Sequence, residues 1–118
     1  MKVKYILFFL FTIYSTASMA AFSEVENSQL ASINGKVTSE VKSALDDLNK
    51  SVDAQISNNP EHKSLILGLK TSWRVMIDKK CQLETIDSKG TDAEMAAVGN
   101  CLVSNYQEEM KYFDAMLP

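Results

Sequence analysis

Apolar residues recur every three or four positions along most of this chain, and that spacing is the strongest constraint on its fold. Between residues 30 and 56 the apolar positions step by 3, 4, 4, 3, 4, 4 and 4, which is the period of one face of an α-helix. No segment alternates between apolar and polar residues for long, so we expect no sheet. The residues of this first stripe are Leu30, Ile33, Val37, Val41, Ala44, Leu48, Val52 and Ile56.

Two more stripes of the same period follow, each preceded by a helix-start signal. Asn59 and Pro60 suit the cap and the first position of a second helix. Thr91 and Glu94 have the spacing of a capping box before a third. Because short turns join helices that lie antiparallel, the sequence predicts an all-α fold, an antiparallel three-helix, or at most four-helix, up-down bundle. The expected helices cover residues 36–57, 60–86 and 92–117.

Residues 1–20 have the pattern of a secretory signal peptide. Lys2 and Lys4 precede an apolar run of about ten residues, whereas a membrane-spanning helix needs roughly 20. Ser18 and Ala20 fit a small-x-small cleavage site, and no cysteine follows that could carry a lipid. We therefore expect cleavage after about Ala20 and a periplasmic or secreted protein that is not a lipoprotein. A loosely ordered segment at 21–35 and a helical domain at 36–118 would follow.

Charge and composition narrow the function classes. The chain has 12 basic and 15 acidic residues, a net charge of −3, and loss of the two lysines in the leader would make it −5. Lys and Arg are not in excess over Asp and Glu, so the sequence does not favour nucleic-acid binding. One His and two Cys are too few for most metal sites. We expect no cofactor, no metal, no nucleic acid and no stable membrane insertion.

The two cysteines, Cys81 and Cys101, are expected to form a disulfide. An even number of cysteines in an exported protein favours a structural bridge. A disulfide between them would close a loop with 19 residues between the cysteines and stabilise the fold by roughly 3 kcal/mol in the chain-entropy model. The alternative is a redox pair, which usually has Cys-x-x-Cys spacing on a βαβ unit.

Catalytic groups are poorly supported by the sequence, and we expect no enzyme. His62 lies among charged residues on a polar face, where a solvated histidine is expected. The adjacent carboxylates Asp46-Asp47 and Glu108-Glu109 diverge by about 100° around a helix, so we expect solvated faces rather than an acid–base pair.

Three residues of the second helix have plain structural interpretations. Arg74 and Asp78 are four positions apart and are expected to form a surface ion pair. Trp73 lies on the apolar stripe, where a core position is expected rather than a binding anchor.

The spacing from Trp73 through both cysteines resembles the lysozyme inhibitor LprI-like domain family of small exported bacterial proteins. The resemblance covers about residues 40–117. It implies that the motif residues have structural roles. It also implies that the protein binds and inhibits a protein partner, a lysozyme or another cell-wall hydrolase. The matching residues are Trp73, Asp78, Cys81, Gly90, Thr91, Cys101 and Leu102.

The turn between the second and third helices is the candidate partner-binding segment. Ser88 and Lys89 could donate hydrogen bonds to the carboxylates of a lysozyme cleft, and an acidic protein would be steered to a basic enzyme. An ordinary polar helix–helix turn is the alternative interpretation. The candidate residues are Asp87, Ser88, Lys89, Gly90 and Thr91.

A different function class stays open from the sequence. The long stripe from Leu30 to Ile56 could form a seam with a second chain. The protein would then be a structural or assembly module of the periplasm, or a homodimeric interaction module. A redox protein and a small-ligand carrier are less favoured.

Overall fold

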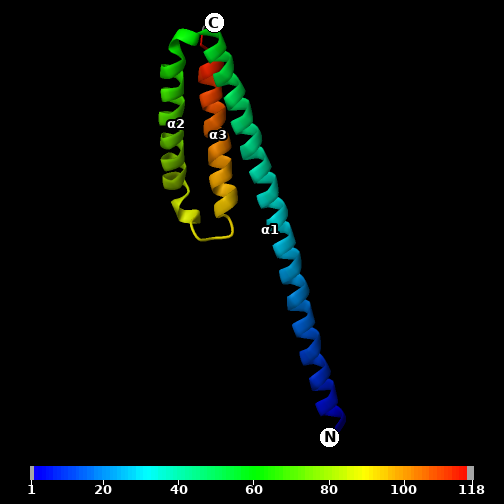
Figure 1. Ribbon diagram of the computed structural model, residues 1–118. Coiled ribbons are helices and arrows are strands. Elements are labelled where there is room, and N and C mark those ends of the chain that lie inside the picture. The colour runs from blue at the N-terminus through cyan, green and yellow to red at the C-terminus, as the bar shows by residue number, and fades with distance from the viewer. Residues whose placement is uncertain (1, 117–118) are drawn as a thin grey trace. The chain divides into compact units, whose positions relative to one another are not determined.

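The chain is a helical bundle closed by one disulfide, which confirms the predicted fold class. The structure, a computed structural model, describes the backbone of residues 2–116 and the side chains of 24–116. Those residues contain no strand. The elements in order are α1 (Lys2–Asn58), the 3₁₀ helix η1 (Pro60–His62), α2 (Lys63–Glu84), the 3₁₀ helix η2 (Ile86–Ser88) and α3 (Glu94–Asp114), as Figure 1 shows.

The chain divides into two units, residues 1–33 and 34–118, and the second unit contains the bundle. Helix α1 belongs to both, and it passes through Asn34-Gly35, where the sequence predicted an interruption. The segment 21–35, which was expected to be loosely ordered, is helical. One glycine costs a helix only about 1 kcal/mol, and good helix formers surround this one.

The predicted signal peptide, residues 1–20, lies outside the part whose side chains are described. Within the described residues, no helix is both long enough and apolar enough to cross a membrane.

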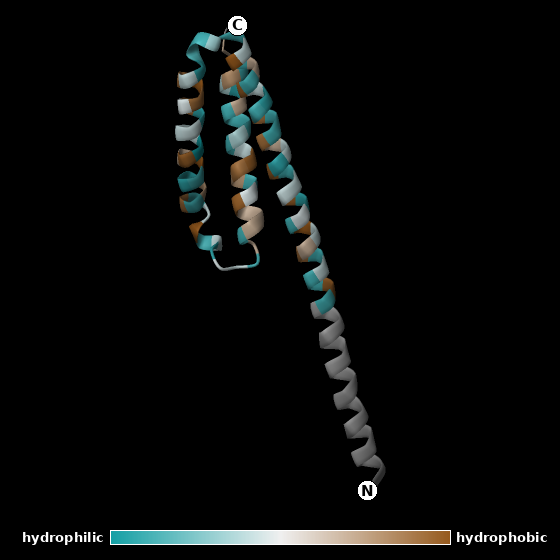
Figure 2. Ribbon diagram, in the orientation of Figure 1, coloured by the Kyte–Doolittle hydropathy of each residue, from teal (hydrophilic) through white to brown (hydrophobic). Residues whose placement is uncertain are grey.

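The three apolar stripes meet in one core within residues 34–118. From Val37 onward the α1 stripe contains buried residues, so this part of the stripe packs into the core of the bundle. Hydrophobic residues recur along all three helices in Figure 2. The buried cluster consists of Ala44, Leu48 and Val52 from α1, Ile66, Ile77 and Cys81 from α2, and Tyr106 and Phe113 from α3.

Helices α2 and α3 form a hairpin. They lie side by side and run in opposite directions in Figure 1. Cys81 and Cys101 form the predicted disulfide across the hairpin, with their Cα atoms 5.7 Å apart. Lys80 Nζ also donates a hydrogen bond to Asn105 Oδ1 at 3.0 Å.

The ends of α1 and α2 differ slightly from the prediction. Asn59 does not cap the second helix; its Nδ2 donates to the backbone oxygen of Gln55 at 3.2 Å and so closes the end of α1. Pro60 begins the 3₁₀ turn η1 rather than α2, which starts at Lys63.

Candidate functional site

The turn from Thr85 to Glu94 is held by a continuous set of local hydrogen bonds. The backbone nitrogen of Ser88 donates to Thr85, that of Lys89 to Ile86, and that of Thr91 to Ser88, all over 3.0–3.2 Å. At its start, Thr85 Oγ1 donates to the backbone oxygen of Cys81 at 2.6 Å, which ties the turn to a disulfide residue.

The far side of the turn is fixed by Gly90 and Glu94. Gly90 has φ of 77°, a conformation that L side chains rarely adopt, so glycine is needed there. Its backbone nitrogen donates to Glu94 Oε2 at 2.8 Å. The predicted capping box is thus shifted by one residue: Glu94 holds Gly90 rather than Thr91, and α3 begins at Glu94 instead of residue 92. Thr91 keeps part of the predicted capping role, because its Oγ1 accepts a hydrogen bond from the Ala93 backbone nitrogen at 3.3 Å while it donates to the oxygen of Ser88 at 2.6 Å.

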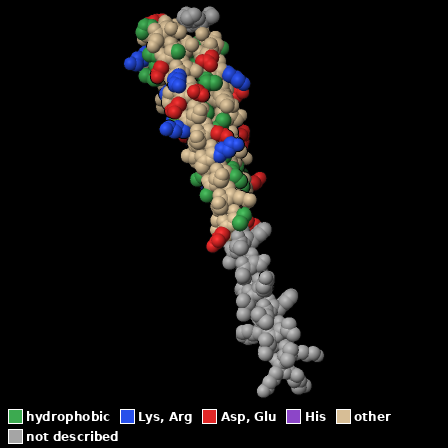
Figure 3. Space-filling model, turned by 90° about the vertical axis from the view of Figure 1, so that its right-hand side faces the viewer, with side chains coloured by type: hydrophobic (Ala, Val, Ile, Leu, Met, Phe, Trp, Pro, Cys, Tyr) green, Lys and Arg blue, Asp and Glu red, His purple; other side chains and the backbone are tan. Residues whose placement is uncertain are grey.

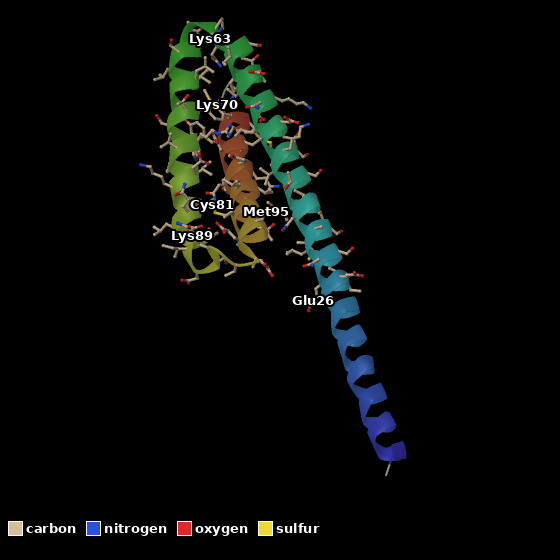
Figure 4. All side chains as sticks on the ribbon, turned by 60° about the horizontal axis from the view of Figure 1, so that its bottom comes forward. Glu26, Lys63, Lys70, Cys81, Lys89 and Met95 are labelled. Carbon is tan, nitrogen blue, oxygen red and sulfur yellow. A yellow bond between two sulfur atoms is a disulfide. The ribbon has the colours of Figure 1, made fainter. Side chains whose placement is uncertain are left out.

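The predicted turn residues lie together on the surface. Asp87, Lys89, Gly90 and Thr91 are exposed, and Ser88 is half-buried. Figure 4 shows Lys89 and Met95 near the end of the hairpin that contains Cys81. The bridge therefore fastens the helices directly behind the candidate segment.

A surface hollow of about 570 Å³ lies next to this turn. Two apolar side chains that it includes, Leu83 and Ile86, are 72% and 59% exposed. Exposed apolar side chains that gather beside polar ones are typical of contact surfaces. The sequence analysis did not identify the hollow because its residues come from the end of α2, the turn and α3. Its lining consists of Lys79, Gln82, Leu83, Thr85, Ile86, Lys89, Glu94 and Val98.

The motif residues outside the turn have structural surroundings. Trp73 is half-buried, and its ring lies 5.3 Å from that of Tyr112 and 6.2 Å from that of Phe113. Leu102 also packs against the core. These contacts favour the core interpretation of Trp73.

The predicted ion pair between Arg74 and Asp78 is not among those that residues 24–116 form. Both charges act on core groups instead. Burial raises the pKa values of Tyr106 and Glu109; the charge of Arg74 opposes both increases, and the charge of Asp78 adds to that of Tyr106.

His62 is exposed, as predicted, and its Nε2 lies 3.6 Å from Glu61 Oε1. Of the adjacent carboxylates, Asp46, Asp47 and Glu108 are exposed. Charges of both signs are interspersed over the face drawn in Figure 3.

Glu109 corrects the prediction that the Glu108-Glu109 pair is solvated. Its side chain is 1% exposed, and neither carboxylate oxygen has a hydrogen-bond partner. The spacing contained the signal: residue 109 lies three positions after Tyr106 and four before Phe113, on the buried stripe of α3. Desolvation raises the pKa of Glu109 to about 7, although the charges of Lys70 and Arg74 oppose this.

Helix α2 also has an exposed apolar side, which lies next to its core-facing residues and borders α3. Leu65, Met76 and Leu83 are 75%, 52% and 72% exposed and follow helical spacing on one side of α2. Gly68 lies near this side, and a Cβ placed on it would meet nothing within 4 Å.

The described residues contain no cluster of His, Cys, Asp and Glu suited to a metal ion. No family model matches this chain, and neither curated proteins nor solved structures yielded a similar protein.

Proposed function

We propose that this chain is an exported bacterial envelope protein that binds and inhibits a lysozyme or a related peptidoglycan hydrolase. The binding segment would be the turn at 87–91. The observation that carries this proposal is the fixed geometry of a polar, donor-bearing turn directly beside the Cys81–Cys101 bridge. A turn that is ordered before binding loses little conformational entropy in the complex.

Chemistry at the turn supports the same partner class. Ser88 and Lys89 supply donors for the carboxylates that glycoside hydrolases hold in their clefts. Leu83 and Ile86 add exposed apolar area beside the turn. The net negative charge would steer the protein toward a basic enzyme, an attraction that salt weakens.

The proposed location is the periplasm or the extracellular space, after cleavage at about Ala20. The disulfide supports an oxidising compartment, because such bridges rarely persist in the cytosol.

A titration of the purified, oxidised protein against a panel of lysozymes tests the proposal. Cell-wall lysis and calorimetric binding would be followed together, and near-stoichiometric inhibition weakened by salt is expected. The Ser88→Ala/Lys89→Ala variant should bind at least about tenfold more weakly, because it loses two donors that would be desolvated in the complex.

The matched control is Lys63→Ala/Ser64→Ala, which removes the same two side-chain types at the other end of α2. That end is roughly 30 Å away at 1.5 Å per residue, and inhibition should not change. No binding to any lysozyme would contradict the assignment of a lysozyme as the partner. Inhibition that the turn variant leaves intact would contradict the choice of segment alone.

The exposed apolar side of α2 favours a second candidate function, that of a homodimeric interaction module. The α1 stripe that suggested a seam is buried inside the bundle from Val37 onward, whereas Leu65, Met76 and Leu83 are free to pack against another chain. Gly68 would let a second helix approach closely.

Light scattering over a range of protein concentrations distinguishes this candidate. A dimer that Met76→Lys dissociates would support it, because the lysine places a charge in an apolar contact. Met95→Lys is the control, since Met95 is exposed to a similar extent, 53%, on a different helix. A monomer at every concentration would contradict the homodimer.

A further inference from the structure

Within the described residues, the bundle buries one carboxyl group, that of Glu109. Glu109 lies between Tyr106 and Phe113 on the buried side of α3, and its side chain is 1% exposed. Neither Oε1 nor Oε2 accepts or donates a hydrogen bond. A charged carboxylate in this position would be desolvated without compensation, whereas a neutral carboxylic acid is tolerated far better.

Two cations of α2, Lys70 and Arg74, face Glu109 and attract its charged form, but burial outweighs them and raises its pKa to about 7. Neither cation forms an ion pair with it among the described residues. On α3 itself the neighbouring titratable group is Tyr106, whose pKa is raised by burial and also by the charges of Asp78 and Glu109. No ionisable group of α1 is among those that shift the pKa of Glu109.

Glu109 lies in the half of the hairpin that has no covalent link. It is two helical turns beyond Cys101 on α3, and Lys70, whose charge acts on it, lies between Lys63 and Cys81 on α2 (Figure 4). Among the described residues, the contacts that hold this half include the packing of Trp73 against Phe113.

The same half also contains unfilled space. An apolar surface hollow of about 190 Å³ lies between the first turns of α2 and the last turns of α3. The hollow is lined by His62, Leu65, Leu69, Tyr112, Phe113 and Met116, among others.

We propose that ionisation of Glu109 opens the disulfide-free half of the bundle, while the half that contains Cys81, Cys101 and the 85–94 turn stays closed. The proton leaves Glu109 for solvent, and the carboxylate is then hydrated when the end of α3 moves away from α2. The device acts apart from the turn and does not depend on the proposed function.

The direction in which pH shifts the opening equilibrium follows from the protonated and ionised forms of Glu109. Below about pH 4.5 the carboxyl is protonated in both the closed and the open state, so pH has no effect through this group. As the pH rises from there to about 7, the open state ionises first and opening becomes more favourable. The total change in the opening equilibrium is roughly 300-fold, and it is complete above neutrality.

Trp73, the chain's only tryptophan, is a built-in reporter because it contacts Tyr112 and Phe113 in the same half. Its emission should change between pH 5 and pH 8.5 in the wild-type protein. The change should be absent in Glu109→Gln, which keeps the shape of the side chain and cannot ionise. Glu108→Gln, which removes the adjacent exposed carboxylate, should behave as wild type.

Amide hydrogen exchange of the wild-type protein, corrected for the intrinsic rate at each pH, locates the opening. Protection should fall by up to roughly 300-fold at residues 66–73 and 106–113, and should hold at residues 77–101. An equal loss over all three helices would overturn the local device. Emission that does not respond to pH in wild type, or responds equally in Glu109→Gln, would overturn the role of Glu109.

Discussion

Two glycines in the middle of neighbouring helices have opposite surroundings. A Cβ on Gly99 of α3 would collide with Cγ1 of Val37 on α1, whereas a Cβ on Gly68 of α2 would meet nothing. Gly99→Ala should therefore destabilise the fold by about 1–3 kcal/mol through overpacking. Gly68→Ala should stabilise it by about 0.5–1 kcal/mol, the ordinary gain in helix propensity. Urea unfolding of both variants measures the difference.

The double variant Val37→Ala/Gly99→Ala tests whether the collision is the cause. Removing the Val37 methyl groups makes space for the new Cβ, so part of the loss from Gly99→Ala should be recovered beyond additivity. Equal responses of the two glycines would show that the α1–α3 approach at Gly99 is looser than described.

Residue-scale burial was only partly predictable from the sequence. The stripes identified core positions because burial follows the helical period, and Ala44, Leu48 and Val52 of the first stripe are buried. Glu109 was missed because its residue type was given more weight than its position on the stripe. Asp46 and Asp47, which lie off the buried stripe of α1, are exposed as predicted.

At the scale of elements, the disulfide should account for a large share of the stability of the α2–α3 hairpin. The bridge joins residues 20 positions apart, and a loop of that length is worth roughly 3 kcal/mol in the chain-entropy model. Reduction with dithiothreitol should lower the free energy of unfolding by about that amount, and Cys81→Ser/Cys101→Ser should match it. Thermal unfolding with and without reductant measures this, and identical midpoints would contradict the expected contribution.

Helix existence was predictable and helix ends were not. The three periodic segments are helices, but Asn34-Gly35 does not interrupt α1 and Pro60 starts a 3₁₀ turn. Ends depend on competing side-chain hydrogen bonds, such as Asn59 to Gln55 and Thr91 to Ser88. Several partners satisfy the same local pattern, so spacing alone does not choose between them.

At the scale of the whole molecule, the sequence predicted a helical bundle but not its surfaces. The bundle follows from three apolar stripes and two short turns. The hollow beside the turn combines residues of α2, α3 and the segment between them, so it exists only after packing. The exposed apolar side of α2 was not predicted, because the sequence spacing does not separate its residues from the neighbouring apolar residues that face the core.

The bridge between Cys81 and Cys101 also makes the hairpin turn part of a covalent ring. A protease that cuts the exposed 87–91 segment would therefore release no fragment, because both cut ends remain attached through the sulfur atoms. The nicked protein would migrate as one species without reductant and as two pieces after reduction. This exposed segment can thus be cleaved once without the molecule falling apart.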